Sequence, residues 1–337
     1  MAVCNFLRRV TMSGSKILAS AHYVPRDIVT NNDLAKIIDT SDEWIQAHTG
    51  IKTRHISLQG ENTSDLATRA AESVLSQTDI KPEDIDLIIV TTFTPDGLAP
   101  STAALVQRNL HAENAWAYDI VTACSGFVFG LSTADKFIKS GQYKNALVIS
   151  AEVNSKMMDF KDRTSTVFFG DGAGAVLMTA DDVGIVEAEK MHTIGNADVV
   201  HSGRIAPLTS LSVDNYPKID AFSQQGRNVF DEVTTIVPDH IRNFLSEHNL
   251  STSDIDYFIP HQANLRLIEY IANDLGEPMT KFSTNVVTNG NTSSAGIAIG
   301  LDELNKSVSL KGKRVLLTGF GAGFTYGSML LQFQRKP

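Results

Sequence analysis

The chain has 337 residues, 42% hydrophobic and 20% charged, which suits two domains or one large two-lobed fold with a sizeable core. Its formal net charge of −9 argues against a nucleic-acid-binding protein, because that class usually shows a basic surface. The two cysteines, Cys4 and Cys124, are too few for a disulfide framework or a four-thiolate metal site, so we expect a cytoplasmic protein. No apolar run approaches the roughly 18 residues of a membrane helix, and no membrane association is expected.

The N-terminal residues carry their positive charge after a short apolar stretch, which is the reverse of the order in a secretory signal peptide. Met12 offers a second possible start. We therefore expect residues 1–15 to form a leader or a flexible N-terminus.

Two stretches of the first half of the chain recur loosely in the second half. Residues 80–90 return as 250–260, and residues 143–150 return as 312–319, at offsets of 170 and 169 residues. Because the two offsets nearly agree, they predict a duplicated unit. We place the first half at residues 16–180 and the second at 181–337, with a loop insertion around 192–225, where Gly, Ser, Asp and Pro are frequent and periodicity is poor.

Hydrophobic periodicity predicts alternating helices and strands in both halves. The elements expected in the first half are, in chain order, a helix through Leu66–Leu75, a strand at Leu87–Val90, a helix at Ala103–Leu110, a strand at Ala115–Val121, a helix at Phe127–Lys139 and a strand at Ala146–Ile149. Those of the second half are a helix through Val229–Phe244 with a kink at Pro238, a strand at Tyr257–Ile259, a helix at Leu265–Leu275 and strands at Lys281–Val287 and Val315–Leu317. Short apolar strands between helices predict sheets covered by helices on both faces.

Three residues are candidates for catalysis. Cys124 stands between a predicted strand and a helix, where the helix N-terminus favours a thiolate and would lower the thiol pKa. His261 directly follows a strand, at the position where open α/β sheets bind ligands. Asn291 lies in a turn of small residues. Each alone has an ordinary structural explanation: a buried thiol, a structural histidine and a turn or helix cap.

Two glycine-rich stretches, Phe169–Gly174 and Gly319–Phe324, lack the context of a dinucleotide-binding or phosphate-binding loop. Their glycines would allow close backbone approach, as in an oxyanion hole, or simply tight packing. The nine histidines form no His-x-x-x-His pair, and no metal site is expected. Taken together, a thiol nucleophile, two hydrogen-bond donors for an enolate and a glycine-rich turn form a usable set for thioester chemistry.

From about Lys16 onward the sequence resembles the β-ketoacyl-[acyl-carrier-protein] synthase III family, which catalyses the initiating condensation of fatty-acid synthesis. The motifs that carry the resemblance are Ser41-Asp-Glu-Trp44-Ile with Thr49-Gly-Ile51, Thr122-Ala-Cys124-Ser-Gly, Asp162-Arg163 with Phe169-Gly-Asp-Gly-Ala-Gly174, His261-Gln-Ala-Asn264, Gly290-Asn291-Thr-Ser-Ser and Gly319-Phe-Gly-Ala-Gly323. The resemblance implies a thiolase-like five-layer α/β/α/β/α sandwich built from two duplicated halves and assembled as a homodimer.

The resemblance also implies residue roles. Cys124 would take an acyl group from acyl-CoA, and His261 and Asn291 would promote decarboxylation of malonyl-acyl-carrier protein, whose enolate then attacks the acyl-enzyme. The remaining assignments are Trp44 and Arg163 around the CoA adenine, Phe320 beside the cysteine, Asn264 in substrate binding, and Gln262 and Arg266 in carrier contact. No cofactor is implied, since acyl-CoA is a substrate.

Several positions depart from the family pattern. His48 stands where the family commonly has an arginine near the CoA phosphates, which weakens charge-fixed binding. Asp231, Asn273 and Asp274 replace residues of the carrier surface that are often lysine, which should weaken attraction of an acidic carrier. Ala99 is small at a position where a bulky residue of the partner subunit often lines the acyl pocket, which would admit a longer or branched primer.

Three other functions are compatible with these residues. A specialised condensing or acyl-transfer enzyme of a secondary, polyketide-like pathway would tolerate the altered carrier surface. A thiol-dependent thioester hydrolase would use Cys124 and His261, with Asn291 orienting the imidazole, and would need no malonyl substrate. A non-catalytic carrier-binding homologue is disfavoured because all three polar site residues are present.

Overall fold

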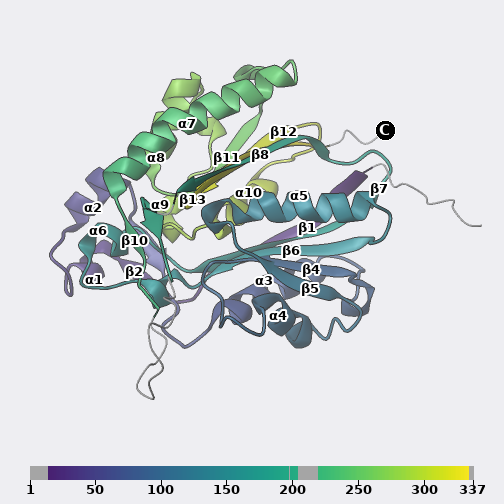
Figure 1. The fold of residues 1–337 in the computed structure, drawn as a ribbon, viewed down its shortest axis with the longest axis horizontal. Helices are drawn as coiled ribbons and strands as arrows, with labels where there is room; N and C mark the ends of the chain where they lie inside the picture. Colours follow the sequence, from purple (N-terminus) through teal and green to yellow (C-terminus); the bar gives the residue numbers. More distant parts are fainter. Residues whose placement is uncertain (1–13, 197, 204–218, 334–337) are drawn as a thin grey trace, which may run out of the picture.

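The computed structural model describes residues 14–196, 198–203 and 219–333, and its elements form five layers (Figure 1). Helices α7 (Gly226–Glu247) and α8 (Leu265–Leu275) form one outer layer, and α3 (Thr63–Leu75) and α4 (Thr102–Leu110) form the other. Helices α5 (Gly126–Lys139) and α10 (Ala295–Ser307) lie in the middle, between two sheets. The predicted five-layer α/β/α/β/α sandwich is confirmed.

The two sheets repeat one strand order. The first sheet has the order β1-β7-β6-β4-β5 and the second has β8-β13-β12-β11, so that β4 and β6 correspond to β11 and β12. The bounds in the first sheet are β1 Gly14–Tyr23, β4 Leu87–Thr91, β5 Trp116–Ile120, β6 Asn145–Glu152 and β7 Gly172–Asp181; those in the second are β8 Val186–Asn196, β11 Tyr257–Pro260, β12 Arg314–Gly321 and β13 Gly323–Gln332. In both sheets the corresponding pair, β4 with β6 and β11 with β12, is parallel. Each of these four strands begins within one of the stretches that recur in the sequence.

Smaller elements surround this core. The short strands are β2 (Ile28–Thr30), β3 (Thr53–His55), β9 (Val200–His201) and β10 (Ser223–Gln224), and the short helices are α1 (Asn31–Leu34), α2 (Asp42–Thr49), α6 (Arg163–Thr166) and α9 (Val286–Asn289). Single 3-10 turns occur at Pro82–Asp84, Ala123–Ser125, Asn154–Met157, Thr252–Asp254 and Met279–Lys281. Buried apolar side chains form three clusters, one under each outer helix pair and one around α5 and α10. None of the helices in the described ranges is long and apolar enough to cross a membrane.

The strand predicted at Lys281–Val287 is wrong. Only Phe282 forms a bridge, to Phe258 of β11, and the segment then turns into the short helix α9. The physical reason is that side-chain amides take the place of strand pairing. The Gln262 Oε1 accepts from the backbone N–H of Val286 at 3.2 Å, and the Asn285 amide donates to the Gly296 carbonyl at 2.9 Å.

Other predicted boundaries shift by a few residues. Helix α3 begins at Thr63, ahead of the expected Leu66, because Asn62 is its N-cap and forms a capping box with Asp65. Strand β1 begins at Gly14, so two residues assigned to the leader belong to the sheet, while Cys4 and Met12 lie outside the described residues. Residues 192–196, expected in the insertion, extend β8; residue 197 and residues 204–218 also lie outside the described part.

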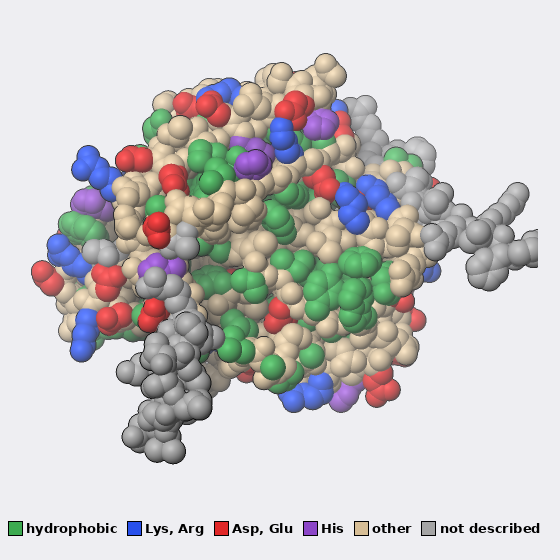
Figure 2. Space-filling view, viewed as in Figure 1, with side chains coloured by type: hydrophobic (Ala, Val, Ile, Leu, Met, Phe, Trp, Pro, Cys, Tyr) green, Lys and Arg blue, Asp and Glu red, His purple; other side chains and the backbone are tan. Residues whose placement is uncertain are grey.

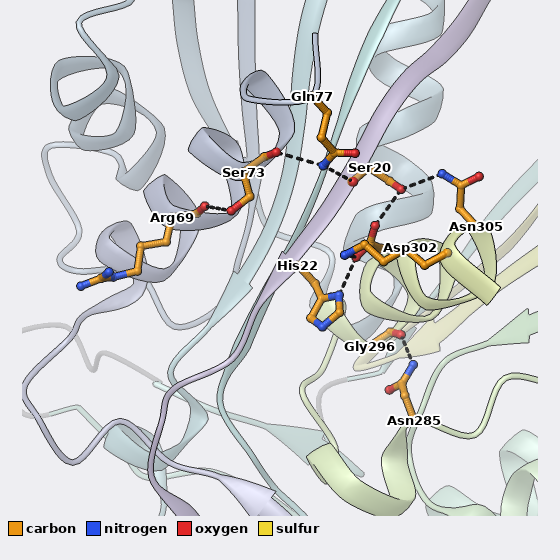
Figure 3. Close-up of polar contacts among 10 residues, drawn as sticks. Ser20, His22, Arg69, Ser73, Gln77, Asn285, Gly296, Asp302 and Asn305 are labelled. Atoms are coloured by element: carbon orange, nitrogen blue, oxygen red, sulfur yellow. Dashed lines mark hydrogen bonds and ion pairs between the residues drawn. The ribbon is translucent and has the colours of Figure 1, made fainter.

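Polar contacts join α10, in the second half, to β1, in the first (Figure 3). The buried carboxylate of Asp302 accepts from the Ser20 hydroxyl at 2.9 Å and lies 2.6 Å from His22 Nδ1. The Asn305 amide also donates to the Ser20 hydroxyl, at 3.2 Å. At the start of α10, the Asn285 amide holds the Gly296 carbonyl. These contacts fix the helix that directly follows the Asn291 turn.

Candidate active site

Cys124 lies in the 3-10 turn Ala123–Ser125, between strand β5 and helix α5. The preceding residue, Ala123, has a left-handed backbone with φ of 45°, which an L-residue adopts at a cost and which marks a strained turn. Gly321 of β12 approaches from the other side, where a Cβ would lie only 2.9 Å from Cys124 Cβ and 3.3 Å from the sulfur. The thiol is therefore held in one place, and only glycine fits opposite it.

The environment of the Cys124 thiol raises its pKa to about 12, mainly because burial disfavours the thiolate. The Ser293 hydroxyl, which donates to Cys124 Sγ at 3.4 Å, works in the opposite direction, and the Glu152 carboxylate adds to the increase. This is the reverse of the lowered pKa expected from the helix N-terminus. Burial of the sulfur therefore favours the thiol form of Cys124 in the free enzyme.

His261 lies at the end of β11, where its backbone N–H donates to the Thr318 carbonyl at 2.8 Å. Its ring packs edge-on against Phe320, with the ring centroids 5.1 Å apart. Burial lowers the pKa of His261 to about 3, and a backbone hydrogen bond with Ser293 opposes this only in part. The imidazole is therefore neutral at physiological pH. Its Nδ1 is buried and has no hydrogen-bond partner within the described structure.

Asn291 is held through both its backbone and its side chain. Its N–H donates to the Phe168 carbonyl at 2.8 Å, and its own carbonyl accepts from Gly170 N–H at 3.1 Å. The Ser293 N–H donates to Asn291 Oδ1 at 2.8 Å. Because the amide oxygen is already used, the amide NH₂ is the group left to donate to a substrate.

The glycine-rich stretch that follows Phe169 supports Asn291 instead of binding a phosphate. A Cβ on Gly170 would collide with the Asn289 carbonyl at 2.1 Å, so only glycine allows this approach. The buried Asp171 carboxylate accepts from Ser57 N–H at 2.8 Å and from the N–H and hydroxyl of Ser155 at 3.0 and 2.7 Å. Of the two explanations that the sequence left open for this stretch, the contact of Gly170 with Asn289 supports tight packing.

One largely apolar cavity of about 630 Å³ brings the three candidate residues together. Cys124, His261 and Asn291 line it, and Phe93, Phe169 and Phe320 supply much of its apolar wall. The residues come from both halves of the chain, with Cys124 from the first and His261 and Asn291 from the second. A thioester carbonyl bound in this cavity would meet a thiol and two neutral hydrogen-bond donors in an environment with little water.

Ser293 belongs to this site and was missed in the sequence. It is completely buried, and its backbone has a left-handed φ of 53°. It contacts Cys124 through its hydroxyl, and Asn291 and His261 through its backbone. The sequence offered only a run of small polar residues, which is typical of any turn.

The residues expected around the CoA adenine also meet. The Arg163 guanidinium carbon lies 5.7 Å from the Trp44 ring centroid, although 119 positions separate them in the sequence. On α2, His48 stacks on Trp44 with the ring centroids 4.2 Å apart and the planes 22° apart. His48 therefore forms an extra aromatic layer on Trp44, at the position where the family commonly has a charged side chain.

Gln262 and Arg266, assigned to carrier contact, and Asn264, assigned to substrate binding, differ in their surroundings. Gln262 is completely buried, and its amide donates to the carbonyls of Pro260 and Ser283, so we correct its assignment from carrier contact to support of the site. Asn264 Oδ1 accepts from Leu267 N–H at 2.9 Å as the N-cap of α8. Arg266 is partly exposed, and its guanidinium donates to the Gln46 and Ala47 carbonyls at the end of α2.

The altered carrier surface is accessible, and so is Ala99. Asp231, Asn273 and Ala99 are exposed. Asp274 accepts from Arg242, which also pairs with Asp239. No group of three or more His, Cys, Asp or Glu side chains in the described ranges is placed to hold a metal ion.

Comparison with known proteins decides the family. Models of 3-oxoacyl-[acyl-carrier-protein] synthase III match residues 118–195, and models of its C-terminal part match residues 245–333. The chain is 56% identical to β-ketoacyl-[acyl-carrier-protein] synthase III 1 of Lactiplantibacillus plantarum over 94% of this chain and 98% of that one. The chain belongs to the β-ketoacyl-[acyl-carrier-protein] synthase III family. It is accordingly an acyltransferase of the initiating condensation in fatty-acid synthesis.

Solved structures of the synthase III family agree with this assignment. The enzyme of Aquifex aeolicus VF5 superposes with a TM-score of 0.87 at 40% identity, covering 95% of this chain and all of that one. The priming β-ketosynthase of the R1128 polyketide pathway superposes with a TM-score of 0.86 at 32% identity, covering 96% and 97%. The second comparison shows that relatives of similar fold are also found in polyketide synthesis.

Proposed function

We propose that Cys124 takes an acyl primer from acyl-CoA and passes it to the enolate formed from malonyl-acyl-carrier protein, giving a 3-oxoacyl-acyl-carrier protein. The observation that carries this proposal is that Cys124, His261 and Asn291 all line the same apolar cavity. In the first half-reaction the Cys124 sulfur forms a bond with the acyl carbonyl carbon, the carbon–sulfur bond to CoA breaks, and the thiol proton ends on the CoA sulfur.

The second half-reaction needs two donors and no charged base. When malonyl decarboxylates, negative charge develops on the thioester oxygen. A neutral imidazole and a primary amide each donate one hydrogen bond to that oxygen. The pKa of His261, about 3, keeps its ring neutral throughout the physiological range. The Ser293 N–H binds the Asn291 amide oxygen, so the amide nitrogen points away from Ser293 and is left to donate to a substrate. Cys124 is therefore the nucleophile, and His261 and Asn291 are the pair that stabilises the enolate.

We propose that CoA lies against Trp44 and Arg163. The ring centroids of paired aromatic groups lie about 4.5–7 Å apart, so a base inserted between Trp44 and Arg163 needs more room than the 5.7 Å that separates the guanidinium carbon from the indole centroid. Arg163 therefore moves outward on binding, which its exposed position allows. The stack of His48 on Trp44 extends this platform by one ring without supplying the permanent charge of an arginine.

We propose that Arg266 and the surface of α7 and α8 meet the acyl carrier. The support is their exposure, since Asp231 and Asn273 are solvent-accessible on the two helices of one outer layer. With acidic or neutral groups at these positions, and a net charge of −9, electrostatic attraction of an acidic carrier is weak.

We propose a homodimer formed through β5. This strand is the last in the order of its sheet, so one of its edges is open within the chain. Hydrophobic side chains gather on the face over β4 and β5 (Figure 2), and an aromatic cluster includes Trp116, Tyr118, Phe137 and Tyr143. A second copy pairing here would cover Trp116, now 47% exposed, and Val121, 71% exposed. Tyr118→Arg should shift the sedimentation coefficient towards that of a monomer, and an unchanged coefficient would place the interface elsewhere.

The remaining assignments are part of the same proposal. The protein is cytoplasmic, needs no cofactor because both substrates are activated thioesters, and divides near residue 180 into two thiolase-like halves. A role in a polyketide-like pathway is the alternative, favoured by the exposed Asp231 and Asn273 on the carrier surface.

Self-acylation tests the proposed function directly. Wild-type protein is incubated with a panel of straight and branched acyl-CoAs, and the intact mass is measured before the adduct is located by peptide mapping. We expect one acyl group on Cys124, and none in Cys124→Ala. An adduct on Cys4 with Cys124 free, or no adduct with any acyl-CoA, would contradict the proposal.

A further inference from the structure

Ser293 is the one side chain in the described site whose hydroxyl contacts the sulfur of the nucleophile. Its Oγ donates to Cys124 Sγ at 3.4 Å, across 169 positions of sequence. The Ser293 side chain is completely buried, whereas Cys124 is partly exposed at the cavity wall, so this hydrogen bond lies where the protein core meets the cavity. A sulfur accepts such a bond more strongly as a thiolate than as a thiol, because the acceptor then carries a full negative charge.

We propose that the Ser293 hydroxyl is a catalytic group of the acyl-transfer step, which stabilises the Cys124 sulfur as negative charge develops on it during attack on the acyl-CoA carbonyl. Ser293 keeps its own proton. The Cys124 thiol proton leaves, the new sulfur–carbon bond forms, the bond between the acyl carbon and the CoA sulfur breaks, and the proton ends on that sulfur. This role rests on the proposed function, in which Cys124 is the acylated residue.

The backbone of Ser293 supports a role for its side chain. A φ of 53° is the left-handed region, which glycine adopts without cost and other residues adopt at a cost. A glycine here would keep the N–H that orients Asn291, since that bond comes from the backbone. What only a hydroxyl-bearing residue adds is the bond to the sulfur. The two functions of Ser293 are therefore separable by substitution.

The thiol also faces other groups that affect its ionisation. The Glu152 carboxylate, at the end of β6, disfavours the thiolate, and its own pKa is raised to about 7 by burial. His261, at the end of β11, is neutral, and Glu232 of α7 lines the same cavity. Since none of these supplies a positive charge near neutral pH, the Ser293 hydroxyl is the side-chain group that offsets the burial of the sulfur.

The test compares Ser293→Ala with Ser294→Ala, a matched variant that removes a hydroxyl from the next, equally buried residue of the same turn. The rate of alkylation of Cys124 by iodoacetamide is measured by peptide mapping from pH 6 to pH 10, without any acyl-CoA. We expect the alkylation rate of Ser293→Ala to be lower than that of the wild type by a factor of about ten or more at each pH, the effect of losing one hydrogen bond to a charged group. Its pH profile should be displaced to higher pH. Ser294→Ala should follow the wild type.

A second readout excludes a merely structural role. Malonyl decarboxylation, which depends on Asn291 and His261, should continue in Ser293→Ala at a rate close to that of the wild type. Equal alkylation of Ser293→Ala and wild type would overturn the role of the hydroxyl, and so would a parallel loss of alkylation and decarboxylation. Because alkylation needs no acyl-CoA, a wild type that is alkylated at Cys124 but never acylated would instead contradict the proposed function.

Discussion

Arg266 of α8 binds the last turn of α2 through Gln46: its Nη2 donates to the Gln46 carbonyl at 2.9 Å. The same guanidinium donates to the Ala47 carbonyl at 3.1 Å. The Gln46 carbonyl also accepts from the Gly50 N–H at 2.9 Å, and carbonyls at a helix C-terminus carry partial negative charge, so a guanidinium is well suited to bind there. The capped turn holds His48, which stacks on Trp44 one turn earlier. A residue that the sequence suggested only as a carrier contact therefore also positions the proposed CoA platform.

We accordingly expect Arg266→Ala to affect both half-reactions. The KM for acyl-CoA in the priming step should rise about fivefold, which corresponds to the loss of roughly one net hydrogen bond, while the maximal priming rate stays nearly constant. Arg242→Ala is the control, since Arg242 pairs with Asp239 and Asp274 on α7 and α8. Stopped-flow measurement of CoA release checks this. A normal KM for acyl-CoA with a slower carrier step would restrict Arg266 to carrier contact.

The two enolate donors should be separable from the nucleophile. His261→Ala and Asn291→Ala should still acylate Cys124, but should lose malonyl decarboxylation by about 10²-fold or more, the usual effect of removing one oxyanion donor. Release of carbon dioxide from malonyl-carrier measures the second step, and intact mass measures the first. If both variants decarboxylate at the wild-type rate, the role assigned to the pair is wrong.

The carrier surface gives a prediction with a defined dependence on salt. Asp231→Lys combined with Asn273→Lys should raise kcat/KM for an acidic carrier and leave priming by acyl-CoA unchanged. Asp274 is left in place, because it forms an ion pair with Arg242. For the wild type, moderate salt should leave the carrier rate flat or raise it, since screening over ~10 Å relieves like-charge repulsion. A steep fall of the wild-type rate with salt would show that a basic docking patch exists elsewhere.

Asp302 should contribute to stability in a pH-dependent way. Burial raises its pKa, but hydrogen bonds from His22, Lys306 and Ser20 more than offset this, and the net pKa lies below 3.8. A carboxyl with a depressed folded-state pKa stabilises the protein above its unfolded-state pKa, and the contribution is lost as the pH falls through the folded-state value. Asp302→Asn should therefore lower the free energy of unfolding at pH 7 by about 2 kcal/mol, the worth of a hydrogen bond to a charged group.

The deficit of Asp302→Asn should shrink as the pH falls below 4, and chemical denaturation at several pH values measures it. Asp239→Asn serves as the control, because that carboxylate is 64% exposed and its pair with Arg242 should contribute little. An Asp302→Asn variant as stable as the wild type at pH 7 would show that the contacts between β1 and α10 do not hold the halves together.

The sequence predicted the parts of the site that follow directly from local pattern. Cys124 and His261 each come at the end of an apolar strand, and the topology brings such ends together. Ser293 could not be found in this way, because its role depends on a left-handed φ and on a contact 169 residues away. The pKa of Cys124 was expected in the wrong direction, since a sequence shows the helix start but not the burial that outweighs it.

Similar reasons explain the errors in the fold. The run at Lys281–Val287 has strand-like residues at both ends. Instead of pairing as a strand, it is held by side-chain amides: Gln262 accepts from the Val286 N–H, and Asn285 donates to the Gly296 carbonyl. The resemblance assigned Gln262 to carrier contact, whereas its side chain is completely buried between β11 and that segment. In the first case a tertiary contact overrode a local preference.

The fate of a preformed acyl-enzyme distinguishes a condensing enzyme from a thioester hydrolase. Cys124 is acylated with an acyl-CoA, free CoA and excess substrate are removed, and the acyl-enzyme is mixed either with malonyl-acyl-carrier protein or with buffer alone. We expect the Cys124 adduct to persist in buffer and to disappear on addition of the malonyl-carrier, with one 3-oxoacyl-carrier formed for each acyl group lost. Rapid loss of the adduct in buffer, with release of the free acid and no dependence on the malonyl-carrier, would contradict this expectation and identify a thioester hydrolase.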